Sequence, residues 1–77
     1  MKSHKLKFYL TLDGVLFVQP ARLQFVPSVG MRIRLNHLDE FRCIKEVWCD
    51  VDVLEIDLEP IAGELPEVVE KYGWTIV

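Results

Sequence analysis

The chain has 77 residues and a net charge of −3, and 41 of the 77 are Gly or apolar (Ala, Val, Ile, Leu, Met, Phe, Trp and Cys). This length predicts a single domain over residues 1–77, and this composition excludes a disordered or low-complexity chain. The longest apolar run covers only residues 15–18, which is too short for a membrane span, and no secretory signal is recognisable. We therefore expect a soluble, cytoplasmic protein.

The kinds of apolar residue favour sheet over helix. Val, Ile, Thr, Phe, Tyr and Trp account for 25 of the 77 residues, whereas Ala occurs only twice. Side chains branched at Cβ and aromatic side chains pack well on a pleated sheet and lose rotamer freedom in a helix. The composition therefore predicts a mainly β fold.

The first third of the chain predicts a hairpin followed by a short strand. Apolar and polar residues alternate over residues 6–12, which is the period of a half-buried strand. Asp13-Gly14 suits a two-residue turn in which both positions need positive φ, so we expect a second strand over residues 15–18. Pro20 should end that strand because proline cannot donate to a ladder. A third strand is predicted over residues 22–25.

The next segment begins with a turn at Pro27-Ser28-Val29-Gly30, after which Arg and aliphatic residues alternate over residues 31–35. This pattern resembles a connection common in small SH3-like barrels. Residues 36–49 are ambiguous, because their apolar spacing fits either a strand or an amphipathic helix. As a strand, this segment would pair with residues 53–59, with Val47 opposite Leu54.

The C-terminal part predicts a short helix from Glu64 to Tyr72, since Pro66 is tolerated in a first turn and Gly73 suits the residue after the last turn. Its apolar side should dock on the sheet, because two turns of helix are not stable alone in water; the residues of that side are Leu65, Val68, Val69 and Tyr72. The whole chain is thus expected to be a small antiparallel SH3-like barrel, or a curved sheet of five or six strands, with one short C-terminal helix. An α+β class is the alternative if residues 37–48 are helical.

The sequence offers little that could carry catalysis. Ser3 and Ser28 lack the context of an activated nucleophile, and no Gly-rich phosphate loop is present. Cys43 and Cys49 are too far apart along a strand for a disulfide and have no zinc-ligand spacing. The carboxylates at positions 55, 57 and 59 fit a solvated strand face. We expect a non-enzymatic protein with no catalytic residues, no metal and no cofactor.

Two groups of residues are candidates for binding. In the strand register above, Ile44, Trp48 and Val53 share a face that is otherwise charged, and aromatic anchors ringed by charge are typical of interface centres. Either the C-terminal helix covers this cluster, or it binds a partner protein or a second copy of the chain. The sequence leaves both open for the cluster; for the function of the chain we favour the second, an interaction module with self-association as a homodimer.

The alternative is a small barrel that binds nucleic acid through a basic and aromatic face of the first strand. Residues 1–35 carry a balance of +5 and residues 36–77 a balance of −8, so the bases are gathered in the first half. Phosphates would contact the cations while a base stacks on the ring. The candidate residues are Lys5, Lys7, Tyr9, Arg32 and Arg34.

Overall fold

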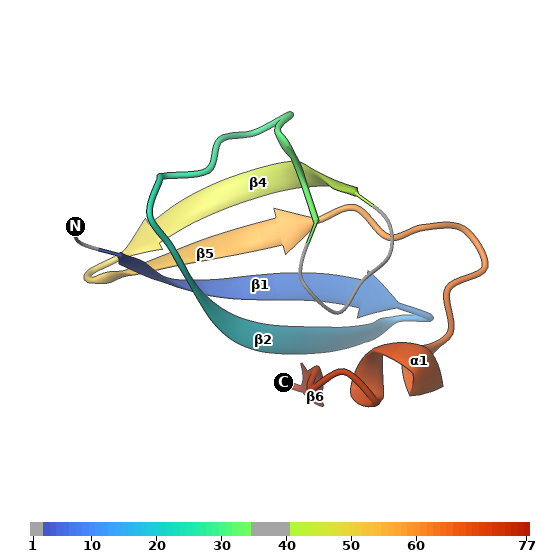
Figure 1. The fold of residues 1–77 in the computed structure, drawn as a ribbon. Helices are drawn as coiled ribbons and strands as arrows, with labels where there is room; N and C mark the ends of the chain where they lie inside the picture. Colours follow the sequence, from blue (N-terminus) through green and yellow to red (C-terminus); the bar gives the residue numbers. More distant parts are fainter. Residues whose placement is uncertain (1–2, 35–40) are drawn as a thin grey trace.

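The computed structural model describes residues 3–34 and 41–77, which form one curved sheet and one short helix (Figure 1). The strands are β1 (His4–Leu12), β2 (Val15–Leu23), β3 (Arg32–Ile33), β4 (Arg42–Asp50), β5 (Val53–Leu58) and β6 (Thr75–Ile76), and the helix is α1 (Pro66–Glu70). Their order across the sheet is β3-β4-β5-β1-β2-β6. The predicted mainly β class with a short C-terminal helix is confirmed.

The first hairpin forms as predicted, with Leu12 opposite Val15 and positive φ at Asp13 and Gly14. However, β2 continues through Pro20 to Leu23, so the prediction of a strand end and of a separate third strand over residues 22–25 is wrong. The strand continues because Pro20 stands at a position that donates no hydrogen bond to β1. In a hairpin with a two-residue turn, the position of Pro20 is one whose N–H would point away from β1. Strand β6 pairs with β2 only at Phe17 and Val18, so no ladder bond is lost at the proline.

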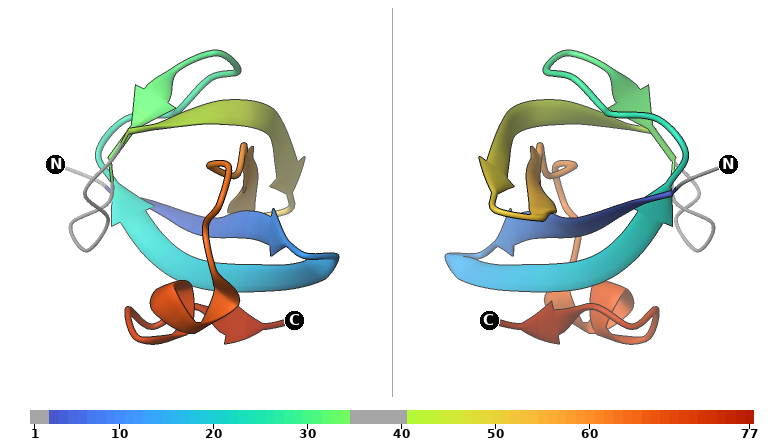
Figure 2. Two further views of the ribbon diagram at one scale, coloured as in Figure 1. Left: turned by 90° about the vertical axis from the view of Figure 1, so that its right-hand side faces the viewer. Right: turned by 90° about the vertical axis from the view of Figure 1, so that its left-hand side faces the viewer.

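The sheet is mixed, because β1 and β5 run parallel, whereas an antiparallel sheet was expected. After β2 the chain passes to the far edge of the sheet before β4 begins, and the β4–β5 hairpin then returns β5 beside β1 in the same direction (Figure 1). Strands β3 and β6 are the two edges, so the sheet is not closed into a barrel. Of the two predicted forms, barrel or curved sheet, the curved sheet is the one that forms (Figure 2).

Strand β4 contains a β-bulge between Ile44 and Glu46. The segment 42–48 is therefore strand and not helix, whereas residues 37–40 of the ambiguous stretch lie outside the described residues. The predicted register is wrong by two residues, since Val47 is opposite Ile56, not Leu54. Before the bulge the difference is one residue, because Ile44 and not Cys43 lies opposite Leu58, and the side chain of Ile44 therefore points to the core.

The core lies on the inner side of the curved sheet and includes the inward row of β1. Its buried apolar members are Leu6, Phe8, Leu10, Leu12, Phe17, Ile33, Ile44, Ile56, Leu58, Val69 and Trp74. Burying each large apolar side chain contributes roughly 1.5–3 kcal/mol. The helix supplies only Val69, because Leu65, Val68 and Tyr72 are exposed, contrary to the expectation that all four would dock.

Candidate functional site

The outer face of the sheet carries the side chains that point away from the core. They are Glu46, Trp48 and Asp50 on β4, Val53, Glu55 and Asp57 on β5, Lys5, Lys7, Tyr9 and Thr11 on β1, and Leu16, Val18, Pro20 and Arg22 on β2. The strand register sets their neighbours. Glu55 lies between Trp48 and Lys7, and Asp57 lies between Glu46 and Tyr9.

A hollow of about 270 Å³ opens on this face and is lined by residues from four neighbouring strands. We call it the Trp48 hollow. Its lining residues are Tyr9, Thr11, Leu16, Trp48, Glu55 and Asp57. Trp48 is 49 % exposed and Leu16 is 39 % exposed, whereas the two carboxylates are half-buried. The hollow therefore combines two aromatic rings, an aliphatic side chain and two acids.

Two polar groups of the hollow, Tyr9 and Asp57, have shifted pKa values. The hydroxyl of Tyr9 donates a hydrogen bond of 2.8 Å to Oε1 of Glu55. This bond to a carboxylate, with burial as a smaller cause, raises the pKa of Tyr9 above 10.0. Burial also raises the pKa of Asp57 above 3.8, Lys45 opposes this shift, and Glu46 adds to it. The anionic form of Asp57 is therefore less well solvated than it would be in open water.

The structure separates the predicted cluster of Ile44, Trp48 and Val53. Ile44 is 1 % exposed and belongs to the core, so its predicted place on the charged face is wrong. The cause is the bulge beside Lys45, which reverses the alternation of side chains along β4. Trp48 remains on the outer face as expected, and Val53 lies on that face beside a second hollow.

The C-terminal helix does not cover Trp48. Strands β5, β1 and β2 lie between β4 and the C-terminal elements, and Figure 1 shows α1 beyond β2. Of the two outcomes expected for this tryptophan, burial beneath the helix is therefore wrong. An uncovered aromatic surface remains.

The predicted basic stripe is divided between β1 and the edge strand β3, which are not neighbours in the sheet. Lys5 and Lys7 share the outer face with Tyr9, as expected from the alternation along β1. Arg32 lies in the edge strand β3 and Arg34 follows it, with the Arg34 Cζ 5.2 Å from the centre of the Phe41 ring. Strands β4 and β5 separate β3 from β1, so the five residues do not form one surface.

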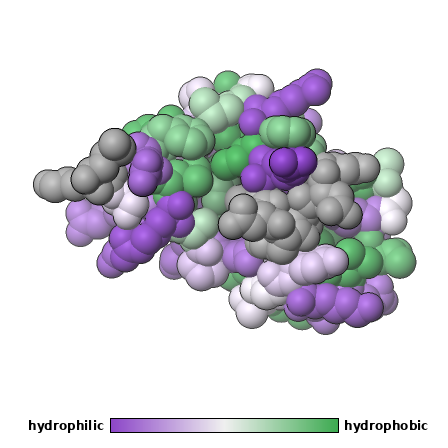
Figure 3. Space-filling model, in the orientation of Figure 1, coloured by the Kyte–Doolittle hydropathy of each residue, from purple (hydrophilic) through white to green (hydrophobic). Residues whose placement is uncertain are grey.

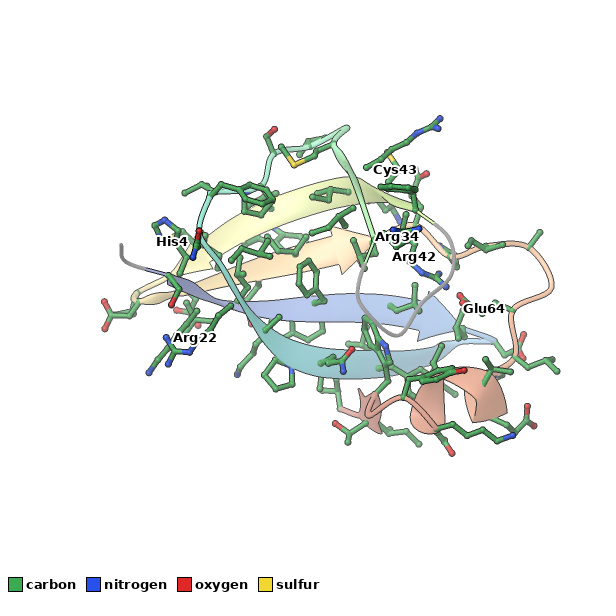
Figure 4. All side chains as sticks on the ribbon, in the orientation of Figure 1. His4, Arg22, Arg34, Arg42, Cys43 and Glu64 are labelled. Atoms are coloured by element: carbon green, nitrogen blue, oxygen red, sulfur yellow. The ribbon has the colours of Figure 1, made fainter. Side chains whose placement is uncertain are left out.

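A different arginine joins the two lysines. Arg22 of β2 lies opposite Lys5. These three cations, with Pro20 and Val53, line a hollow of about 410 Å³. Figure 4 shows Arg22 at the left of the molecule and Arg34 well apart from it, right of centre. Sequence reasoning missed Arg22 because it placed residue 22 in a separate strand.

A buried ion pair was also missed. Arg42 of β4 donates from Nη1 to Oε1 of Glu64 over 2.6 Å, and its Nη2 contacts the second carboxylate oxygen. Figure 4 shows the two side chains pointing toward one another from β4 and from the connection between β5 and α1. Their side chains are only 3 % and 10 % exposed. No sequence signal links these two positions, which makes the pair a product of the tertiary fold.

Other surfaces and side chains show no comparable arrangement. Within residues 3–34 and 41–77, no three His, Cys, Asp or Glu side chains come together as a metal site would require. Cys43 and Cys49 are free thiols. Figure 3 shows apolar side chains at the surface over the connection between β2 and β3, where Phe25, Val26 and Val29 are exposed.

Comparison of the chain with protein-family models, with curated proteins and with solved structures finds no match. Among the described residues, no helix is long and apolar enough to cross a membrane.

Proposed function

We propose that this chain is a non-enzymatic interaction module that binds protein through the outer face of its sheet, and that its partner is a second copy of itself. The observation that carries the proposal is the half-exposed Trp48 beside a hollow on a sheet face that no other element of the described chain covers. Tryptophan is among the residues most enriched in the energetic centres of interfaces. The surrounding charged residues would form the polar rim.

The charge distribution on the outer face favours a second copy as the partner. The half formed by β4 and β5 carries Glu46, Asp50, Glu55 and Asp57, whereas the half formed by β1 and β2 carries Lys5, Lys7 and Arg22. A two-fold axis that lies in this face and runs between the two halves would place each half against the opposite half of the other copy. In that arrangement the face is complementary in charge to itself.

Sedimentation velocity over a range of protein concentrations tests the proposal. Wild type should form a dimer, and Trp48→Glu should be a monomer because a carboxylate would then lie in the centre of the interface. Phe25→Glu is the matched control, since Phe25 is 48 % exposed and lies away from the outer face, and it should dimerise like wild type. Wild type that stays monomeric up to about 1 mM, or a Trp48→Glu variant that dimerises normally, would refute self-association.

The nucleic-acid alternative has weaker support. Of its five residues, Lys5, Lys7 and Tyr9 lie together on β1, whereas β4 and β5 separate them from Arg32, and the Tyr9 hydroxyl is bonded to Glu55. Four carboxylates lie on the same outer face and would repel phosphates. Binding to single-stranded DNA or RNA that weakens steeply with salt would revive this alternative.

A further inference from the structure

We infer that the Trp48 hollow is a binding site for a cationic side chain, with the guanidinium of an arginine as its preferred ligand. The inference rests on the proposed function for the source of that arginine, which is Arg22 of the second copy. The chemistry of the hollow itself is tested separately with a small ligand.

The arrangement of aromatic and acidic side chains fits a cation. Trp48 and Tyr9 lie on β4 and β1, and the strand between them, β5, carries Glu55 and Asp57. Adjacent strands lie about 4.8 Å apart, and Trp48 is level with Glu55 whereas Tyr9 is level with Asp57, so the two backbone positions are about 12 Å apart. A cation midway between them would lie about 6 Å from both, the distance at which cation–π attraction operates.

The two carboxylates supply the charge that a cation needs. Tyr9 occupies Oε1 of Glu55, and a carboxylate can accept about four hydrogen bonds, so Glu55 retains acceptor capacity. Asp57 is half-buried beside Glu46, and its raised pKa shows that its anionic form is poorly compensated despite Lys45. A guanidinium donates several N–H groups from one plane and stacks on aromatic rings, which a lysine ammonium does not do.

The rest of the hollow suits the stem of such a side chain. Leu16 and the methyl group of Thr11 complete the lining and are apolar. Arginine buries its methylene stem on apolar surface while its charged end reaches polar partners. Arg22 fits this role because it is exposed on the basic half of the outer face, which the two-fold pairing places against the acidic half.

An NMR titration with Nα-acetylarginine amide tests the site, using the indole N–H signals of the two tryptophans. The titration uses Arg22→Gln, which removes the competing side chain of the second copy. The signal of Trp48 should shift saturably with a Kd of about 1–10 mM, while the signal of the buried Trp74 stays in place. The neutral isostere Nα-acetylcitrulline amide should cause no saturable shift.

Two double variants in the Arg22→Gln background separate local chemistry from net charge. Glu55→Gln with Asp57→Asn should weaken binding of the arginine derivative at least about tenfold. Glu67→Gln with Glu70→Gln removes the same number of charges from exposed positions of α1 and should leave the Kd unchanged. Equal shifts with citrulline, no saturable shift at Trp48, or equal losses in both double variants would overturn the inference.

The titration and the sedimentation experiment distinguish a failure of the arginine site from a failure of self-association. A Trp48 signal that titrates with the arginine derivative in a protein that sediments as a monomer supports the site and refutes the dimer. If the protein sediments as a dimer but the Trp48 signal does not shift with the arginine derivative, the site is refuted and self-association is still supported. Arg22→Gln should also weaken dimerisation at least about tenfold, whereas Lys71→Gln, an exposed control of equal charge change, should not.

Discussion

The ion pair between Arg42 and Glu64 gives the sharpest test of how this fold is held together. It joins β4 to the connection between β5 and α1, and both side chains are at least nine-tenths buried. Replacing Glu64 by Gln keeps the shape of the side chain but leaves the charge of Arg42 without its counter-ion. Removing one partner of a buried pair costs about 3–5 kcal/mol, and we expect the lower end because Gln can still accept a hydrogen bond.

That cost is large for a chain of this size. Domains are stable by roughly 0.05–0.15 kcal/mol per residue, which is about 4–12 kcal/mol for 77 residues. With a urea m value of about 1 kcal/mol/M, a loss of about 3 kcal/mol lowers the unfolding midpoint by roughly 3 M. Urea unfolding followed by tryptophan fluorescence measures this shift.

Two controls distinguish an unpaired charge from general damage. Glu67→Gln makes the same chemical change at an exposed position of α1 and should move the midpoint little. Arg42→Met with Glu64→Leu removes both charges, and the double variant should be more stable than Glu64→Gln because buried pairs replaced by apolar residues often cost little. A Glu64→Gln variant within about 1 kcal/mol of wild type would refute the reasoning.

Three further predictions concern the β4–β5 hairpin and the hollow. Val51 is 87 % exposed and has a φ of 54°, so Val51→Gly should raise the free energy of unfolding by about 1 kcal/mol in urea; a destabilised variant would contradict this. Because the pKa of Asp57 is raised in the folded state, ionising it costs stability as the pH rises through that pKa. Asp57→Asn should therefore be more stable than wild type at pH 7, and this difference in stability should vanish below pH 3.8, as measured by urea unfolding at both pH values. A difference that persists below pH 3.8 would show that the ionisation of Asp57 is not its cause. Deleting Lys45 removes the extra residue of the bulge and leaves Ile44 opposite Leu58 and Val47 opposite Ile56, so both side chains should stay inward and the free energy of unfolding should change by no more than about 1 kcal/mol in urea; a loss of several kcal/mol would show that the local twist of the bulge is needed.

Local patterns in the sequence predict much of the fold. Alternation over residues 6–12 and the Asp13-Gly14 turn predict the first hairpin, because the periodicity of a strand and the φ requirement of a tight turn are properties of neighbouring residues. The clean alternation at Leu54, Ile56 and Leu58 likewise predicts β5 and its inward face.

Features that depend on long-range pairing were not predictable. The parallel contact of β1 with β5 joins segments more than 40 residues apart, and no local pattern specifies the direction of such a pair. The bulge at Lys45 changes which side chains of β4 point inward, so Ile44 was assigned to the wrong face while Trp48 was assigned to the right one. The Trp48 hollow needs Tyr9 and Leu16 from the other hairpin, which is why the sequence assigned Trp48 and Tyr9 to two different candidate sites and did not suggest Leu16.

The strand order makes each half of the chain depend on the other. Strand β3 follows the β1–β2 hairpin in the sequence but pairs with β4, and β6 follows the β4–β5 hairpin but pairs with β2. Each half therefore donates its last strand to the other half's hairpin, and the two hairpins join along the parallel seam of β1 and β5. Two fragments produced by a cut between β3 and β4 would each lack both an edge strand and a central neighbour. Each fragment alone should remain unfolded, and the two mixed together should reassemble, because each hairpin pairs with a strand that the other fragment contains.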